Sequence, residues 1–207
     1  MKLAVATLAV MLAVQSVFSQ TESKSTKLHL GINFGADYST LQVANANPLT
    51  IREFTTSPQA GFRLGLVTDY ALSNQFAFVF NPDLSLDKTS LTIVKIDNSN
   101  AVYQTAIAVG AAAHIVYKHL QWSTRPYILF GPRYDIPVIS KTGSGNQLAK
   151  SNLSLELGIG LERAFPNFVF SPELRYSYGL SNISATTDMQ SVQLHTISLI
   201  LIFKGKQ

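Results

Sequence analysis

The stretch LSLELGIGLE at residues 153–162 alternates an apolar side chain with a small or charged one. Its apolar side chains fall on one face of an extended chain: Leu153, Leu155, Leu157, Ile159 and Leu161. Because successive side chains of a β-strand point to opposite faces, the stretch predicts a strand with one apolar face. The other face carries serine, glutamate and glycine.

Seven other segments alternate in the same way. Together they predict eight strands, at 27–38, 59–70, 75–86, 103–118, 125–137, 153–162, 168–180 and 192–203. A chain of 207 residues is long enough for one such domain. The predicted fold class is therefore all-β, a single eight-stranded antiparallel up-and-down barrel.

Four prolines lie in or at the ends of the predicted strands: Pro82, Pro126, Pro132 and Pro172. Proline has no N–H to donate to a β-ladder. Each of these prolines therefore predicts a bulge or a strand end.

The polar faces of the strands favour a transmembrane barrel over a soluble sandwich or lipocalin. They are rich in glycine and also carry charges. A soluble barrel turns its charges outward and has no use for glycine there. A narrow membrane barrel needs small residues and paired charges inside.

The predicted connections alternate in length. The long ones are 39–58, 87–102, 138–152 and 181–191, and the short ones are 71–74, 119–124 and 164–167. Outer-membrane barrels combine tight periplasmic turns with long extracellular loops. This asymmetry predicts that both termini lie in the periplasm.

Aromatic residues near the strand ends predict two interfacial girdles, because amphipathic rings prefer the membrane–water boundary. The girdle at the short turns would contain Tyr70, Phe76, Tyr117, Trp122, Tyr127, Phe165, Phe168 and Phe203. The girdle at the long loops would contain Tyr38, Tyr103, Tyr134 and Tyr178.

The N-terminus reads as a signal peptide. Lys2 precedes an apolar stretch at residues 3–17, and small residues lead to a cleavage point after Ser19. The alternative is an uncleaved anchor helix, although the stretch is shorter than the about 20 residues that a span requires. The predicted organisation is a signal peptide at 1–19, a periplasmic segment at 20–26 and a barrel at 27–207 in the cell outer membrane.

Composition narrows the possible functions. The net charge of +4 comes with only 14% charged residues and no basic cluster, which argues against a nucleic-acid partner. Cysteine is absent, so thiolate metal sites and a cysteine nucleophile are excluded. No catalytic, cofactor or metal motif stands out, and His114 and His195 are interpreted as packed residues. We therefore expect no enzyme activity, cofactor or metal.

The candidate site is a set of charges on the polar strand faces: Arg63, Asp83, Arg133, Asp135, Glu156, Glu173 and Arg175. Hairpin geometry predicts Glu156 opposite Arg175 or Glu173, and Arg63 opposite Asp83. It also allows Arg133 beside Glu156. Because buried charges must be paired, we interpret the set as structural filling of a narrow lumen. The alternative is a polar conduit or ligand site.

Two stretches, residues 125–135 (RPYILFGPRYD) and 170–182 (FSPELRYSYGLSN), resemble the fifth and seventh strands of PorT-like outer-membrane β-barrel proteins of Bacteroidetes. The resemblance implies an outer-membrane barrel. For the best-studied type of member it also implies a part in type IX protein secretion, with secretion-machinery or other envelope proteins as partners.

The leading hypothesis is a non-enzymatic, PorT-like outer-membrane barrel that supports protein secretion, with membrane lipid and envelope proteins as partners. The main alternative is a barrel that uses its long loops for adhesion or surface recognition. A barrel enzyme acting on lipid and a secreted soluble ligand-binding barrel are further alternatives. The lipid enzyme requires a Ser/His/acid cluster at one rim, which the predicted strands do not provide.

Overall fold

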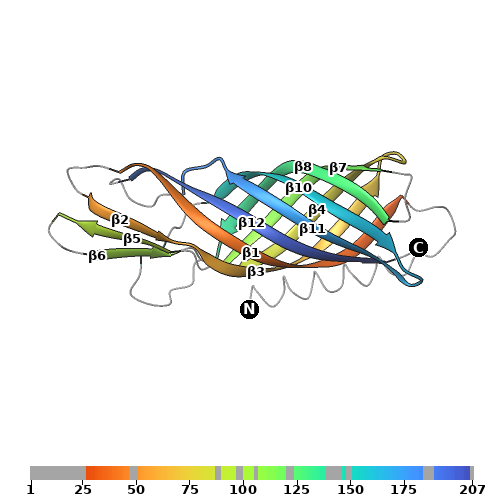
Figure 1. Cartoon of the computed structure of the whole chain (residues 1–207), viewed down its shortest axis with the longest axis horizontal. Helices are drawn as coiled ribbons and strands as arrows, with labels where there is room; N and C mark the ends of the chain where they lie inside the picture. Colours follow the sequence, from red (N-terminus) through yellow and green to blue (C-terminus); the bar gives the residue numbers. More distant parts are fainter. Residues whose placement is uncertain are drawn as a thin grey trace, which may run out of the picture.

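The protein forms a closed antiparallel β-barrel of eight strands that neighbour one another in chain order (Figure 1). The computed structural model describes residues 27–46, 51–86, 90–96, 100–104, 107–119, 124–138, 146–147, 151–183 and 189–205. The barrel strands are β1 (Leu28–Ala46), β3 (Gln59–Ala71), β4 (Phe76–Leu86), β7 (Ile107–Lys118), β8 (Thr124–Pro137), β10 (Asn152–Ala164), β11 (Phe168–Gly179) and β12 (Met189–Gly205). The predicted fold class is confirmed.

The predicted signal peptide and the segment 20–26 lie outside the described residues. Within the part of the chain that the structure describes, no helix combines the length and apolar character that a membrane-spanning helix needs.

The strand register gives the barrel a stagger of ten residues. A path that steps between paired residues leaves β1 at Leu28, crosses every strand and returns to β1 at Tyr38, ten positions further along. A stagger of this kind tilts the strands against the barrel axis, as closure of a small barrel requires. Figure 1 shows the tilt.

The barrel is polar inside and apolar outside. On β10, the Ile159 side chain on the outer face is 60% exposed, whereas Glu156 on the inner face is 0% exposed. Tyr38, Tyr134 and Tyr178 lie on the outer face as predicted. Tyr127 does not: it is 6% exposed and points into the lumen, so its place in the girdle was wrongly predicted. Trp122 lies outside the described residues.

Three prolines lie inside continuous strands, which contradicts the prediction of bulges or strand ends there. Pro82, Pro132 and Pro172 each interrupt the ladder with one neighbouring strand, yet the register is the same on both sides of the gap. Each keeps a paired position on its other side. Each strand tolerates the missing N–H of its proline, because it remains paired with the neighbouring strand on its other side.

A second sheet stands beyond one end of the barrel (Figure 1). It consists of β2 (Ile51–Ser57), β5 (Ser90–Lys95), β6 (Asn100–Gln104) and β9 (Asn146–Gln147), in the order β2-β5-β6-β9. β2, β5 and β6 pair antiparallel, in the order of the barrel strands β3, β4 and β7 that they neighbour in the sequence, whereas β9 pairs parallel with β6. We call this sheet the extension.

The extension corrects three predicted boundaries. The segment 39–58 is mostly strand, since β1 continues to Ala46 and β2 follows. The segment 87–102 contains β5 and part of β6. The predicted strand 103–118 is two strands, because β6 ends at Gln104 in the extension and β7 begins at Ile107 in the barrel.

Candidate functional site: the charged lumen

The inward side chains change character in the same order along several strands. From the short-turn end, the inward residues of β3 are Asp69, Val67, Gly65 and Arg63. On β7 they are Lys118, Val116 and His114. On β12 they are Lys204, Ile202, Ile200 and Ser198. Charged residues at the barrel end are thus followed by apolar residues, and then by further charged and polar residues. The lumen is therefore filled in layers.

The layer at the short-turn end is an ion-pair cluster of four residues, which we call the end cluster. Lys204 Nζ lies 2.7 Å from Asp69 Oδ2 and 2.5 Å from Glu162 Oε2. Lys118 Nζ contacts the same two oxygens, at 2.9 and 3.0 Å. Two ammonium groups and two carboxylates thus neutralise one another across the narrow end of the lumen.

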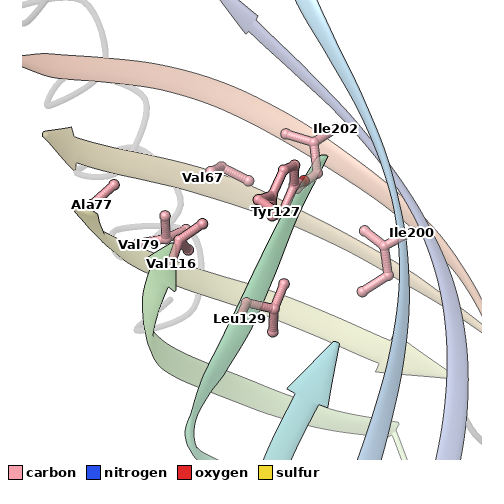
Figure 2. Packing of buried hydrophobic residues seen from close by; sticks show 8 residues of the cluster. All are labelled: Val67, Ala77, Val79, Val116, Tyr127, Leu129, Ile200 and Ile202. Atoms are coloured by element: carbon pink, nitrogen blue, oxygen red, sulfur yellow. The ribbon is translucent and has the colours of Figure 1, made fainter. Parts of the chain in front are cut away.

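The next layer is apolar and lies inside the barrel (Figure 2). It consists of Val67, Ala77, Val79, Val116, Tyr127, Leu129, Ile200 and Ile202. Tyr127 reaches across the space beside Gly160, where an added Cβ would meet the tyrosine ring. Glycine at this position therefore makes room for the ring, and the layer excludes water from the charges beyond it.

Arg133 on β8 binds two acids in the layer above. Its Nη1 and Nη2 donate to the two carboxylate oxygens of Asp83 at 2.6 and 2.7 Å. Its Nε donates to Asp135 Oδ2 at 3.1 Å. Gly110 leaves the necessary space, because an added Cβ there would meet both Arg133 and Asp135. The Arg133–Asp83 pair is bidentate, the strongest geometry for a guanidinium and a carboxylate.

Glu156 on β10 is the centre of the rest of this layer. Its carboxylate accepts hydrogen bonds from Ser177 Oγ at 2.7 Å and from Arg63 Nη1 at 3.4 Å. His114 Nε2 lies 2.8 Å from the other carboxylate oxygen, and Arg175 Nη1 lies 3.5 Å from it. Side chains from three other strands, β3, β7 and β11, thus converge on one buried acid.

Two further acids, Asp37 and Glu173, accept hydrogen bonds from the arginines of this layer. Arg63 Nε donates to Asp37 Oδ2 at 3.1 Å. Arg175 Nε donates to Glu173 Oε2 at 2.6 Å, and Tyr127 donates to Glu173 Oε1, also at 2.6 Å. The Tyr127 hydroxyl therefore links the apolar layer to the charges. We call the charged layer the central network: Asp37, Arg63, Asp83, His114, Arg133, Asp135, Glu156, Glu173 and Arg175.

The structure brings all seven candidate residues into the central network, but not with every predicted partner. Arg63 does not lie opposite Asp83, because the register pairs Arg63 with Ser85 and Gly65 with Asp83. Glu156 lies opposite Ser177 rather than Arg175 or Glu173. Arg133 does lie beside Glu156, with Nε 3.8 Å from Oε1.

Sequence reasoning left out seven residues of the lumen: Asp37, Asp69, His114, Lys118, Tyr127, Glu162 and Lys204. Alternation alone places Asp37 and His114 on inner faces, so that signal was present in the sequence. Lys118 and Lys204 lie at the ends of strands, where sequence alternation gives little guidance on whether a side chain points inward.

The chemistry of the lumen is that of ion pairing. Among the described residues, no group of three or more His, Asp or Glu side chains is arranged to hold a metal ion. His195 lies apart from the network, with its ring against Tyr176 and Tyr178. The ion pairs can stiffen the barrel and fill its interior, because each arginine of the central network contacts at least one carboxylate.

A family model described as an outer membrane protein beta-barrel domain matches residues 18–185. The chain belongs to this family. As an outer-membrane barrel it resides in the cell outer membrane, and its apolar outer face contacts the membrane lipid.

Solved outer-membrane barrels have a similar fold. OprG from Pseudomonas aeruginosa has a TM-score of 0.53 and 10% sequence identity, over 86% of this chain and 94% of that one. Neisserial surface protein A has a TM-score of 0.48 and 14% identity, over 86% and 97%. Ail of Yersinia pestis, solved with the heparin analogue sucrose octasulfate, has a TM-score of 0.43 and 14% identity, over 86% and 99%. No curated protein matches the chain.

Proposed function

We propose that the protein is a non-enzymatic outer-membrane anchor that presents its extension to partners outside the cell. The observation that carries this proposal is the sheet of β2, β5, β6 and β9, which is built from segments between the barrel strands at the long-loop end. In outer-membrane barrels the long loops face outward. Strands that are rooted in a rigid barrel hold a recognition surface more firmly than loops do. Delivery by a signal peptide at residues 1–19 fits this role.

The filled lumen supports an anchor over a conduit. Arg63, Asp83, Arg133, Asp135, Glu156, Glu173 and Arg175 serve as structural filling in this proposal. An eight-stranded barrel has an interior just wide enough for side chains. The end cluster, the apolar layer and the central network occupy that interior in succession, so we expect neither an ion nor an unfolded chain to pass.

A part in type IX-like protein secretion is the second candidate. It is supported by the resemblance of residues 125–135 and 170–182 to strands of PorT-like proteins. With a filled lumen, the protein would act in secretion by binding the machinery and not by passing cargo. Surface adhesion and secretion would therefore both use the extension, and they differ in the partner that the extension binds.

Removal of one hairpin tests the proposal. Residues 90–104, which contain β5 and β6, are replaced by a two-residue Asp-Gly turn in the full-length protein. A matched control replaces the short turn 165–167, at the opposite end of the barrel, with a Gly-Ser linker of equal length. Both variants should keep the heat-modifiable band of a folded barrel, because the barrel strands are intact.

Both variants are then expressed in a strain from which the protein has been deleted. The hairpin variant should fail to restore the deletion phenotype, whereas the turn variant should restore it. Assay of secreted cargo and of cell adhesion in the same strains distinguishes the two candidates. Full restoration by the hairpin variant would contradict the proposal.

A further inference from the structure

The outer wall of the barrel has a groove of about 690 Å³ toward the short-turn end. Apolar side chains from β8, β10, β11 and β12 line it, among them Ile128, Ile159, Leu174 and Leu199. The groove lies in the lipid-facing surface, since Ile128, Ile159, Leu174 and Leu199 are all exposed on the outer face. It is thus a hollow in a surface that lipid covers.

The hollow has a cause in the sequence. Pro126, Gly160 and Pro172 also line the groove. Gly160 adds nothing to the outer hollow, because a side chain there would point inward, toward the Tyr127 ring. Proline rings are short, so the outer wall is low at Pro126 on β8 and at Pro172 on β11, the strands that flank β10. The larger side chains around them stand higher and form the sides of the groove.

A cation stands at the end of the groove nearest the short turns. Arg163 follows groove residue Leu161 by two positions on β10, so the two share the outer face about 7 Å apart. Arg163 is exposed, and its guanidinium carbon lies 5.4 Å from the centre of the Phe165 ring. The neighbouring acid, Glu162, points inward and binds Lys118 and Lys204. Glu162 therefore does not neutralise Arg163, whose side chain lies outside the barrel.

We propose that this groove holds one anionic phospholipid, with an acyl chain along Ile159 and Leu174 and the phosphate at Arg163. An apolar chain gains no hydrophobic energy by leaving lipid for protein, so the shape of the groove decides whether a chain is held. The phosphate is drawn to Arg163, where a cation near a membrane surface contributes about 1 kcal/mol, or about fivefold in affinity. The short-turn end faces the periplasm, so the lipid belongs to the inner leaflet.

Native mass spectrometry of the purified full-length protein tests this site. The probes are dioleoyl phosphatidylglycerol and, for comparison, zwitterionic dioleoyl phosphatidylethanolamine. The wild type should retain one phosphatidylglycerol in preference to phosphatidylethanolamine. Arg163→Ala should lower that retention about fivefold. Ile159→Trp should lower it at least as much by filling the groove.

Two variants serve as controls. Leu157→Trp places the same bulk on the same outer face of β10 but outside the groove, since Leu157 is 59% exposed and Ile159 is 60% exposed. Lys27→Ala removes an exposed cation before β1, a strand that does not line the groove. Both should retain the lipid as the wild type does. Equal retention by all variants, equal loss in the controls, or no preference for phosphatidylglycerol would overturn the proposal.

Discussion

Replacement of Arg133 by methionine should destabilise the barrel strongly. The guanidinium lies 2.6 and 2.7 Å from the two carboxylate oxygens of Asp83, and Asp135 lies against it as well. The side chains of Arg133 and Asp83 are only 3% and 1% exposed. Without the arginine, the buried carboxylate of Asp83 and the partly buried carboxylate of Asp135 lose their shared cation. Breaking a buried pair in this way costs about 3–5 kcal/mol of unfolding free energy.

The partner substitution Asp83→Asn should cost less, about 2 kcal/mol, because Arg133 keeps Asp135 as a partner. In the double variant, Asp83 has been replaced as well, so its carboxylate is not left without a cation when Arg133 is lost. We therefore expect the double variant to be more stable than the sum of the single effects predicts, by about 2 kcal/mol. Such coupling is typical of residues in direct contact.

The measurement is urea-induced unfolding in lipid vesicles, with Ser154→Ala as the control. Ser154 is 1% exposed on the inner face, and its hydroxyl has no hydrogen-bond partner among the described residues. Its loss should change the unfolding free energy by less than about 0.5 kcal/mol. The reasoning is refuted if Arg133→Met matches Ser154→Ala, or if the double variant is destabilised by the sum of the single effects.

Three further changes test other parts of the lumen. Arg175→Ala should lower the temperature at which the folded band disappears on SDS gels, whereas Asn146→Ala in the extension should not, and equal melting would contradict a structural role for the central network. Gly131→Ala should cost about 1–3 kcal/mol in urea, because its Cβ would meet a backbone carbonyl oxygen of β7, whereas Gly205→Ala has its nearest atom at 3.8 Å and should be neutral. Tyr127→Phe should cost about 1–2 kcal/mol, because it removes a 2.6 Å hydrogen bond to a buried carboxylate; an unchanged midpoint would show that this bond contributes nothing.

The barrel strands could be predicted because a membrane barrel imposes one rule on every strand. Lipid contacts one face and a crowded lumen contacts the other, so apolar and small or charged residues must alternate. Residues 153–162 show that alternation without a break, and β10 contains all of them. Strand bounds were accurate where tight turns end the strands.

The extension could not be predicted on the same basis. Its strands form a sheet separate from the barrel, so the alternation that the barrel wall imposes does not apply to them. β9 has only two residues, and β2 is separated from β3 by a single residue, Pro58. In the sequence these segments read as long loops, because polar residues and prolines mark loops and short strands alike.

Two of the predicted cross-strand positions, Arg63 opposite Asp83 and Glu156 opposite Arg175 or Glu173, were wrong for a geometric reason. Partners were predicted between adjacent strands, but several bonds of the central network join strands that are not neighbours in the barrel. Arg133 on β8 binds Asp83 on β4, with β7 between those strands. Pairs of this kind depend on barrel closure and stagger, which local hairpin geometry does not contain. Tyr127 shows the converse case, since alternation with Ile128 and Phe130 places it inside, whereas its position near a strand end suggested a girdle.

Planar-bilayer conductance tests directly whether side chains close the lumen. The purified full-length protein is inserted into a lipid bilayer under an applied voltage, and a porin added afterwards shows that the bilayer can report open channels. We predict no conductance steps from the wild type, because the end cluster, the apolar layer and the central network close the lumen in succession. Stable, reproducible single-channel steps from the wild-type protein would contradict it.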